Sequence, residues 1–231
     1  GVAAWLSRDT VFKAISLENP SSPVVVGEVD SPGQAVDLFR DSSYLYVSGS
    51  EGFQILRSDD PLGPPIGTFS DGMLSESIVR QGVAYLASGN ELLILDVDTP
   101  QNPVELSRTT YVGSVPNAMK LNEDIIYLST ILGGGLNLID VSDPTSPELL
   151  SLIPFEHNWA GIEVWGTFVY LVHGTEYIIN PQSDLGFDSV SIMKVIDVSD
   201  PLNPTIRAQL NLDTDVRSIV RGEALIYVFG S

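Results

Sequence analysis

The sequence predicts an all-β fold, a β-propeller made of four-stranded antiparallel blades. One observation is a proline motif, which reads Ile-Asp-Val-Ser-Asp-Pro-Thr-Ser-Pro at residues 139–147. A second is its recurrence, because copies lie at residues 15–23, 56–64, 95–103 and 196–204. The first prolines, at positions 20, 61, 100, 144 and 201, are 41, 39, 44 and 57 residues apart. The third is this repeat length near forty residues, which is typical of one propeller blade.

The segments between the motifs contain short apolar strands separated by Gly or polar turns. Around the motif at 95–103, the expected strands are 76–80, 83–87, 92–97 and 104–109. The nearly continuous apolar second and third strands indicate burial on both faces, whereas the alternating fourth indicates an outer strand with one face in water. The same four positions are filled in three other blades, at 35–39, 44–47, 53–56 and 65–69; 118–121, 125–129, 136–141 and 148–153; and 161–165, 168–172, 191–198 and 205–212.

The two ends of the chain contain incomplete blades. Residues 1–30 are expected to supply a second, third and fourth strand, and residues 216–229 a first and second strand. We therefore expect one domain over residues 1–231, with about five to six blades. Either the ring has five blades and Val2–Leu6 is a frayed tail, or the chain is a slice of a ring of roughly six to eight blades. The start without methionine and the stop after a second strand favour the slice.

The proline motif is expected to form the turn from the third strand to the outer strand. Its Asp or Asn accepts a backbone hydrogen bond, its first Pro presets the turn, and its second Pro begins an outer strand whose amide need not pair. Five copies therefore indicate turn chemistry. The run Gly133–Gly135 lies between two strands with no helix behind it to hold an anion, so it indicates a hairpin turn.

The composition indicates an acidic globular protein. Hydrophobic residues make up 43% of the chain and charged residues 18%, and 30 acidic against 11 basic residues give a net charge of −19. A chain this negative repels nucleic acid and anionic membrane surfaces. No apolar run approaches the roughly twenty residues needed to cross a bilayer, so a soluble chain is expected. The absence of cysteine removes disulfides, thiolate catalysis and cysteine-bound zinc.

Two third-strand segments, Leu136–Pro144 and Lys194–Pro204, resemble the LVIVD repeat, which takes its name from this strand. The second-strand tyrosines at positions 46, 85 and 127 resemble the tyrosine-containing strand of the same family. The resemblance covers essentially the whole chain. It departs from the pattern at Leu56-Arg57-Ser58, where the Asp-Val-Ser slot is lost, and at the long spacing before Ile192. It implies a β-propeller on secreted or surface-attached microbial proteins, generally without an assigned catalytic residue, so no functional position is carried over.

One face of the predicted fold carries the loops between second and third strands and the connections between blades. This face holds the longest insertion, at about 174–188, and beside it the blade connection at 156–159. Loops on a rigid scaffold often carry recognition. We therefore name four candidate residues of a binding face, with an ordinary packed loop as the alternative: His157, Asn158, Trp159 and Tyr177.

The sequence identifies no catalytic, cofactor-binding or metal-binding residue. Five inner-strand residues occupy roughly matching positions, namely Asp37, Ser77, Lys120, Glu163 and Ser218. A lysine among two acids is expected to form a local ion pair and not a metal site. Asp213 and Asp215 offer oxygen ligands for calcium but lack a loop of known ligand spacing. Catalysis stays open, because a propeller assembles its site from distant blades and leaves no local signature.

These observations leave three functional hypotheses. The first, which we favour, is a non-catalytic extracytoplasmic interaction module that binds a protein or glycan through its loop-rich face. The second is a propeller hydrolase or lyase with a calcium-assisted site at the channel mouth. The third is a structural spacer of a large surface protein. The expected location is extracellular, at the cell surface or in the periplasm, and the expected partners are surface proteins or glycans and neighbouring domains, not nucleic acid or lipid.

Overall fold

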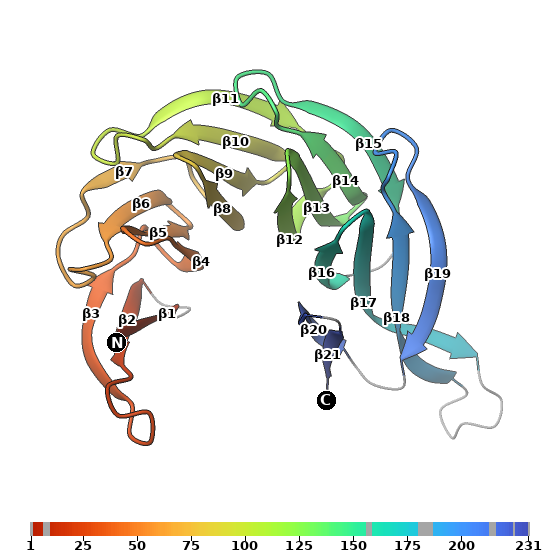
Figure 1. Ribbon diagram of the computed structural model, residues 1–231, viewed down its shortest axis with the longest axis horizontal. Coiled ribbons are helices and arrows are strands. Elements are labelled where there is room, and N and C mark those ends of the chain that lie inside the picture. Colours follow the sequence, from red (N-terminus) through yellow and green to blue (C-terminus); the bar gives the residue numbers. More distant parts are fainter. Residues whose placement is uncertain are drawn as a thin grey trace. The chain divides into compact units, whose positions relative to one another are not determined.

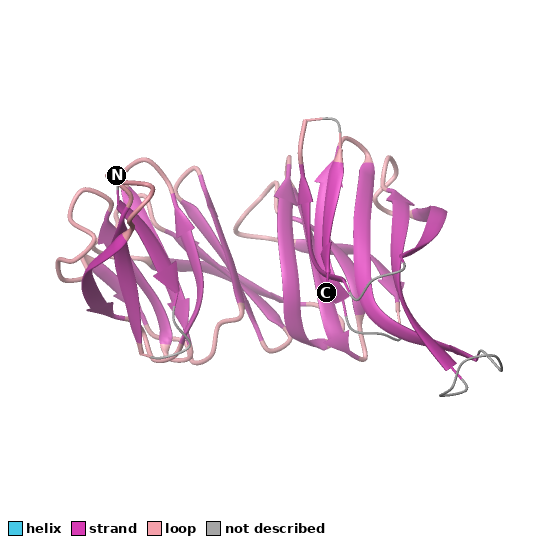
Figure 2. Ribbon diagram, turned by 90° about the horizontal axis from the view of Figure 1, so that it is seen from below, coloured by secondary structure: helices cyan, strands magenta, loops and turns pink. Residues whose placement is uncertain are grey.

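The chain is built from β-strands in the computed structural model, which describes residues 2–6, 10–155, 159–179, 187–212, 216–223 and 225–230. Within these ranges every regular element is a strand (Figures 1 and 2), so the predicted all-β class is confirmed. No helix able to span a membrane occurs among them. The chain divides into two compact units, Gly1–Thr109 with Pro144–Ser146, and Thr110–Asp143 with Pro147–Ser231. The single domain expected from the repeat remains a prediction.

The first unit contains three antiparallel sheets, each called a blade below. The first blade has three strands in the order β1-β2-β3, the second has β4-β5-β6-β7, and the third has β8-β9-β10-β11. Their bounds are β1 Val2–Leu6, β2 Val11–Ser16, β3 Val24–Asp30, β4 Ala35–Arg40, β5 Tyr44–Gly49, β6 Gly52–Arg57, β7 Gly67–Phe69, β8 Glu76–Arg80, β9 Val83–Ser88, β10 Glu91–Asp96 and β11 Val104–Thr110.

The second unit contains the remaining three blades. The fourth blade has the order β12-β13-β14-β15, the fifth has β16-β17-β18-β19, and the sixth has the two strands β20-β21. Their bounds are β12 Ser114–Asn122, β13 Ile125–Leu132, β14 Gly135–Asp140, β15 Glu148–Pro154, β16 Trp159–Trp165, β17 Phe168–Ile179, β18 Phe187–Asp197, β19 Thr205–Leu212, β20 Val216–Arg221 and β21 Ile226–Gly230. The predicted meander of four antiparallel strands is therefore confirmed in four blades.

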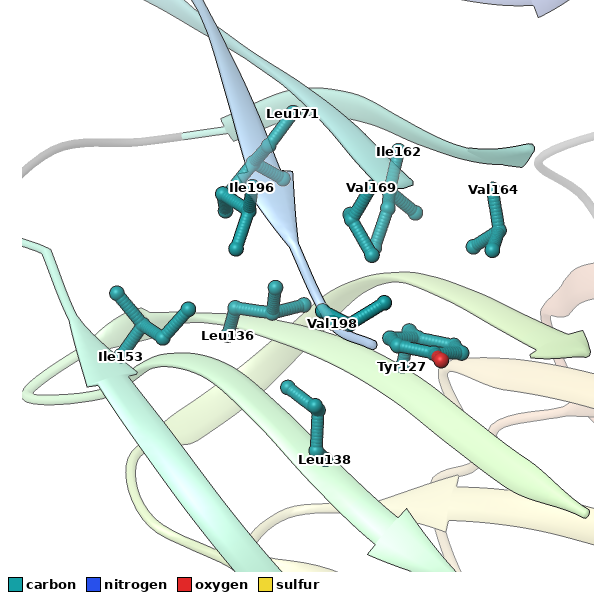
Figure 3. Packing of buried hydrophobic residues seen from close by; sticks show 10 residues of the cluster. All are labelled: Tyr127, Leu136, Leu138, Ile153, Ile162, Val164, Val169, Leu171, Ile196 and Val198. Carbon is teal, nitrogen blue, oxygen red and sulfur yellow. The ribbon is translucent and has the colours of Figure 1, made fainter. Parts of the chain in front are cut away.

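Burial follows the strand position that the apolar pattern predicts. The four central residues of β9 and of β10 are all buried, whereas β11 has none buried. The middle strands are apolar on both faces because each face meets a neighbouring sheet. Figure 3 shows this in the second unit, where Leu136 and Leu138 of β14 lie opposite Ile162 and Val169 of the fifth blade. The core is therefore formed between the sheets of each unit.

The proline motifs form the predicted turn from the third strand to the outer strand, and the structure builds it from two consecutive turns. At the end of the third strand the Asp side chain accepts a hydrogen bond from the backbone two residues on, as between Asp140 Oδ1 and the Ser142 amide at 2.8 Å. The residue before the first proline then accepts a bond from the residue three positions on. In the third blade the Asn102 amide donates to the Thr99 carbonyl at 2.9 Å. Proline therefore sits at the second position of a turn that favours it.

A small residue of each outer strand marks the place where a proline turn can pack. It lies six or seven positions after the first proline of its own motif, at Gly27, Gly67, Ser107, Ser151 and Ala208. The Ser151 hydroxyl donates to the Pro201 carbonyl of the following blade at 2.7 Å. The Ser107 hydroxyl donates in the same way, at 2.6 Å, to Pro144, a turn residue that belongs to the first unit. In four blades the proline turn of the next motif thus packs on the outer strand.

The glycine version of this contact is the tightest. A Cβ at Gly67 would overlap the Pro100 carbonyl oxygen, whereas a Cβ at Gly27 would meet only the end of the Leu62 side chain. We expect Gly67→Ala to lower the free energy of unfolding by about 1–3 kcal/mol, because a backbone carbonyl cannot rotate away. The matched change Gly27→Ala should cost less, because leucine can change rotamer. Denaturant unfolding of both variants measures the difference, and equal losses would contradict the proposed contact.

A buried polar side chain ties the third strand to the connection that precedes its blade. Asn137 of β14 is fully buried, accepts from the Val112 amide at 2.9 Å and donates to the Val112 carbonyl at 3.1 Å. At the same strand position in the second blade, Gln54 donates to the Asp30 carbonyl at 2.8 Å. These side-chain amides hydrogen-bond to backbone groups of the connection between blades, and the Val112 carbonyl also accepts from the Thr130 hydroxyl at 2.9 Å.

We expect Asn137→Ala to destabilise the protein by about 1–3 kcal/mol, because the Val112 amide loses its partner, whereas the Val112 carbonyl keeps its bond from the Thr130 hydroxyl. Asn102→Ala is the control, since Asn102 is exposed in a turn and its change should stay within about 0.5 kcal/mol. Chemical denaturation measures both. A loss of less than about 1 kcal/mol for Asn137→Ala would mean that water replaces the amide.

Candidate binding faces

The antiparallel order gives each blade two ends with different loops. The connections from first to second strand and the proline turns lie at one end, and the connections from second to third strand lie at the other. The proline-turn end is the uniform one, because the motif repeats there. The other end varies most in the fifth blade, where β17 and β18 are the longest strands of the chain, at 12 and 11 residues.

The four predicted binding-face residues all come from this varied end. His157 and Asn158 lie outside the described residues. Trp159 begins β16, where its backbone pairs with His173, and Tyr177 lies farther along β17, paired with Ser189. Tyr177 lies four positions beyond His173, which corresponds to at most about 13 Å along the strand. Trp159 is therefore at the base of the β17–β18 hairpin, and Tyr177 is part way along it.

The insertion that the sequence places at about 174–188 is only partly a loop. Strands β17 and β18 continue into it, with four further pairs from Glu176↔Val190 to Ile179↔Phe187. The expected ends of these strands, at residues 172 and 191, are therefore wrong. A register irregularity between His173 and Glu176 accommodates Gly174 and Thr175, the residues that suggested a break. Beyond it, aromatic and β-branched residues favour strand structure.

This continuation forms a two-stranded ribbon, residues 175–179 with 187–190. Pairing with the first strand ends at Trp159↔His173, and pairing with the outer strand begins at Ser191↔Leu212. In the described part of the chain, the ribbon strands thus pair only with each other. Figures 1 and 2 show the ribbon leaving the four-stranded sheet. Its two edges carry backbone groups available for pairing.

Each unit also has a cavity at the proline-turn end of its blades. The one in the first unit has a volume of about 430 Å³ and is lined by Ser42, Ser43, Tyr44, Arg57, Asp59, Ile66 and Gln101. The one in the second unit has about 390 Å³ and is lined by Asn122, Glu123, Ile125, Tyr127, Gly166, Thr167, Val198, Ser199 and Pro201. Both lie between the hairpin of one blade and the proline turn of the next.

The first of these cavities contains the residue that departs from the repeat. Arg57 occupies the strand position that Asp140 has in the fourth blade. Its guanidinium donates two hydrogen bonds to the Asp59 carboxylate, at 2.9 and 2.7 Å. The arginine lowers the pKa of the Asp59 carboxyl. Sequence reasoning treated Arg57 as a loss of the motif and missed the cavity, although the departure itself was the available signal.

The inner-strand polar residues make contacts between blades. In the first unit Asp37 Oδ2 accepts two hydrogen bonds from Ser77, one from its amide at 2.9 Å and one from its hydroxyl at 2.8 Å. In the second unit Lys120 Nζ lies 3.0 Å from Glu163 Oε1, which confirms the expected ion pair. These two contacts lie at different strand positions. Lys120 and Glu163 each pair with the tyrosine of the second strand of their own blade, whereas Asp37 pairs with Ser48. They therefore form local pairs and not one row.

The described residues contain no group of three or more His, Asp or Glu side chains placed to hold a metal ion. Asp213 and Asp215, whose oxygens the sequence analysis considered for calcium, lie outside the described residues, and only the backbone of His173 is described. The calcium hypothesis therefore stays a prediction.

Asp197, the motif aspartate of the fifth blade, is the most strongly stabilised carboxylate of a proline turn. The Ser199 amide donates to Oδ1 at 2.9 Å, and Arg207 donates two bonds to Oδ2 at 3.0 and 2.8 Å. The backbone and side-chain hydrogen bonds from Ser199, followed by the hydrogen bonding and then the charge of Arg207, lower the pKa of Asp197 to about 2. The turn is therefore held by the ionised form.

This pKa predicts an acid-dependent loss of stability. Because the folded pKa is below the unfolded value of about 3.9, the stabilisation is present above about pH 4 and is lost as the pH falls toward about 2. We expect the free energy of unfolding to fall more steeply across this window in the native protein than in Asp197→Asn. Arg207→Gln, which keeps the Ser199 bond, should give an intermediate slope. Identical slopes in all three, measured by urea unfolding, would contradict the assignment.

Comparison with known proteins identifies a known repeat in part of the chain. The family model of the LVIVD repeat matches residues 76–110 and 131–152. The first match spans the whole third blade, and the second contains β14 with most of β15. No curated protein sequence matches the chain.

Solved structures share the fold at low sequence identity. A protein of unknown function from Desulfotomaculum acetoxidans DSM 771 superposes with a TM-score of 0.69 at 11% identity over 93% of this chain. The designed protein Ika8 and BamB from Moraxella catarrhalis each give a TM-score of 0.71, at 11% and 12% identity over 99% of this chain. This chain spans 71% of the first protein's length but only 65% and 64%, just under two thirds, of the other two. The chain therefore has a β-propeller fold and contains LVIVD repeats, which confirms the resemblance seen in its sequence.

Proposed function

We propose that this propeller is a non-catalytic interaction module that recognises a surface protein or a glycan through the end of the fifth blade that carries the ribbon. The observation that supports this most directly is the ribbon of residues 175–179 and 187–190, whose strands leave the sheet and pair with each other alone in the described part of the chain. An extension of this kind adds nothing to the pairing of the blade.

The backbone of the ribbon suits binding by strand addition. An exposed strand edge offers a row of amides and carbonyls to an extended peptide, and side-chain contacts on alternate residues then provide specificity. The irregularity between His173 and Glu176 re-aims the strand at the point where it leaves the sheet. Trp159 and Tyr177, at the base and part way along, are aromatic residues of the kind enriched where proteins bind partners.

We also propose an extracytoplasmic location, at the cell surface or in the periplasm. Support comes from the LVIVD repeats, whose family resemblance implies secreted or surface-attached proteins, and from the lack of cysteine, which is compatible with either location. The net charge of −19 supports a protein or glycan as the partner, because nucleic acid and anionic lipid would be repelled.

The test is a chain in which Asn-Gly replaces residues 175–190. This replacement keeps Ser191, whose hydroxyl accepts a bond from the Val216 amide at 3.0 Å, and closes β17 and β18 with a two-residue turn. We expect the intact chain to bind members of a glycan array or captured microbial surface proteins, and the shortened chain to lose at least about 90% of that binding, since binding energy concentrates in few residues.

The matched control changes the other end of the blades. Arg57→Ala with Asp59→Ala alters the cavity of the first unit and should leave binding unchanged. Thermal unfolding of both variants shows whether each blade still folds. Binding that survives removal of the ribbon, or that disappears only with the Arg57 and Asp59 changes, would reject the ribbon as the recognition element. No binding by the intact chain would reject the module itself.

A further inference from the structure

One cross-strand pair of the second blade departs from the repeat. In the third, fourth and fifth blades an apolar residue that begins the second strand pairs with the motif aspartate that ends the third strand, as Val83↔Asp96, Ile125↔Asp140 and Phe168↔Asp197. In the second blade the corresponding pair is Tyr44↔Arg57. Both members of the pair differ from the repeat, and both line the cavity of the first unit.

Two further departures adjoin the same cavity. Gln101 follows the first proline of the third motif, a position at which no other motif has an amide. Ser58 stands where the motifs of the third, fourth and fifth blades have a buried valine. Its amide donates at 2.8 Å to the carbonyl of Ser43, which lines the cavity. Changes on two successive blades therefore gather at one place.

The altered residues do not improve the turn. In the third, fourth and fifth blades the aspartate caps the amide two residues on. The Arg57–Asp59 pair replaces this cap, and its side chains are 57% and 69% exposed, so the pair adds little stability. Ser58 Oγ is buried and has no hydrogen-bond partner among the described residues, which costs stability. Changes that weaken a turn and gather at one cavity indicate a binding role and not a packing role.

The cavity offers polar atoms that the protein does not use itself. Arg57 donates to Asp59 through Nε and Nη2, which leaves the two N–H groups of Nη1 available. In the part of the chain that the structure describes, the Tyr44 hydroxyl and the Gln101 amide have no hydrogen-bond partner. Hydroxyl and amide groups both donate and accept, and the Asp59 carboxylate accepts. Carbon atoms of Tyr44 and Ile66 add apolar surface beside these groups.

The charges of the cavity select against an ionic ligand. Among the lining residues only Arg57 and Asp59 are charged, and their charges are opposite. An anion bound to the arginine would meet the aspartate, and a cation bound to the aspartate would meet the arginine. A ligand with many hydroxyl groups uses both without carrying a charge.

We propose that the cavity between the β4–β5 hairpin and the proline turn of the third blade binds a neutral sugar. Its volume of about 430 Å³ is near the lower end of the roughly 300–1,000 Å³ of small-molecule sites, which suits one or two sugar rings. The hydroxyl groups of the sugar bond to Arg57, Asp59 and Gln101. Its C–H groups pack on the apolar atoms of Tyr44 and Ile66.

This site is separate from the ribbon and goes beyond the partner binding proposed for it. A ligand of this size makes few contacts, so its Kd is roughly millimolar. Such affinity does not retain the chain on a washed array. The Arg57 and Asp59 changes therefore remain a valid control for the ribbon.

The test is an NMR titration of the whole chain with free glucose, galactose, mannose and N-acetylglucosamine. We expect at least one of these neutral sugars to bind with a Kd of roughly millimolar. Glucuronate, which carries a carboxylate on the same kind of ring, should bind at least about tenfold more weakly than glucose, because Asp59 repels it. No binding by any of the four sugars, or tighter binding of glucuronate than of all four, would overturn the proposal.

Restoring the repeat gives the most informative variant. Arg57→Asp, Ser58→Val and Asp59→Ser together rebuild the Asp-Val-Ser of the fourth and fifth motifs. This chain should unfold at a temperature at least as high as the native chain, yet bind the sugar at least about tenfold more weakly, because the available arginine donors are lost. Equal sugar affinity in the restored and native chains would overturn the proposal.

A second variant tests the contribution of the neighbouring blade. Gln101→Leu should weaken sugar binding about three- to tenfold, since one hydrogen-bonding group is lost. Leu202→Ala, at the same turn position of the fifth motif, is the matched control and should leave the Kd unchanged. Equal effects of the two changes would overturn the proposal. The ribbon-shortened chain should keep the native sugar affinity, so this result and the test of partner binding fail separately.

Discussion

The contact between a proline turn and one small residue of the preceding outer strand is the constraint on which the packing of these blades depends. The turn is brought close to the strand at a glycine or a serine, and at Gly67 an added Cβ would overlap the Pro100 carbonyl oxygen. Where serine stands there, its hydroxyl donates to the corresponding proline carbonyl, at 2.6 Å for Ser107 and 2.7 Å for Ser151. Each motif therefore has two roles. It forms the turn in its own blade, and it packs on the outer strand of the preceding blade. This double use accounts for a motif that recurs while the rest of each blade varies.

The remaining motif positions serve the same turn. The aspartate holds the next amides in place, and the valine after it is buried at 2%, 1% and 5% exposure at positions 97, 141 and 198. Arg57 shows how the position can change. Its pair with Asp59 replaces the capping bond, and the second blade keeps a turn at the same place, with Gly63 bonded to the Asp60 carbonyl. The turn is maintained by more than one chemistry, which leaves single motif residues free to diverge.

The strands could be predicted from the sequence because the middle strands are buried on both faces and therefore appear as continuous runs of apolar residues. The meander, the buried middle strands and the Lys120–Glu163 pair all follow from local composition and spacing. The ribbon did not follow, because Gly174 and Thr175 look like the start of a loop and a register irregularity absorbs them without ending the strand. The cavities were missed for another reason. Their lining comes from separate blades, and only the folded register brings Tyr44, Arg57 and Gln101 together.

The repeated turns of this fold pack against neighbouring blades, so we look for recognition at the positions that depart from the repeat. The regular turns are occupied by their neighbours, and the inner-strand polar groups are paired within each unit. Two such departures are the ribbon of the fifth blade and Arg57 in the second blade. In the residues that the structure describes, the ribbon has no counterpart in the other blades, so a ligand bound there, as we propose, need not resemble the propeller itself.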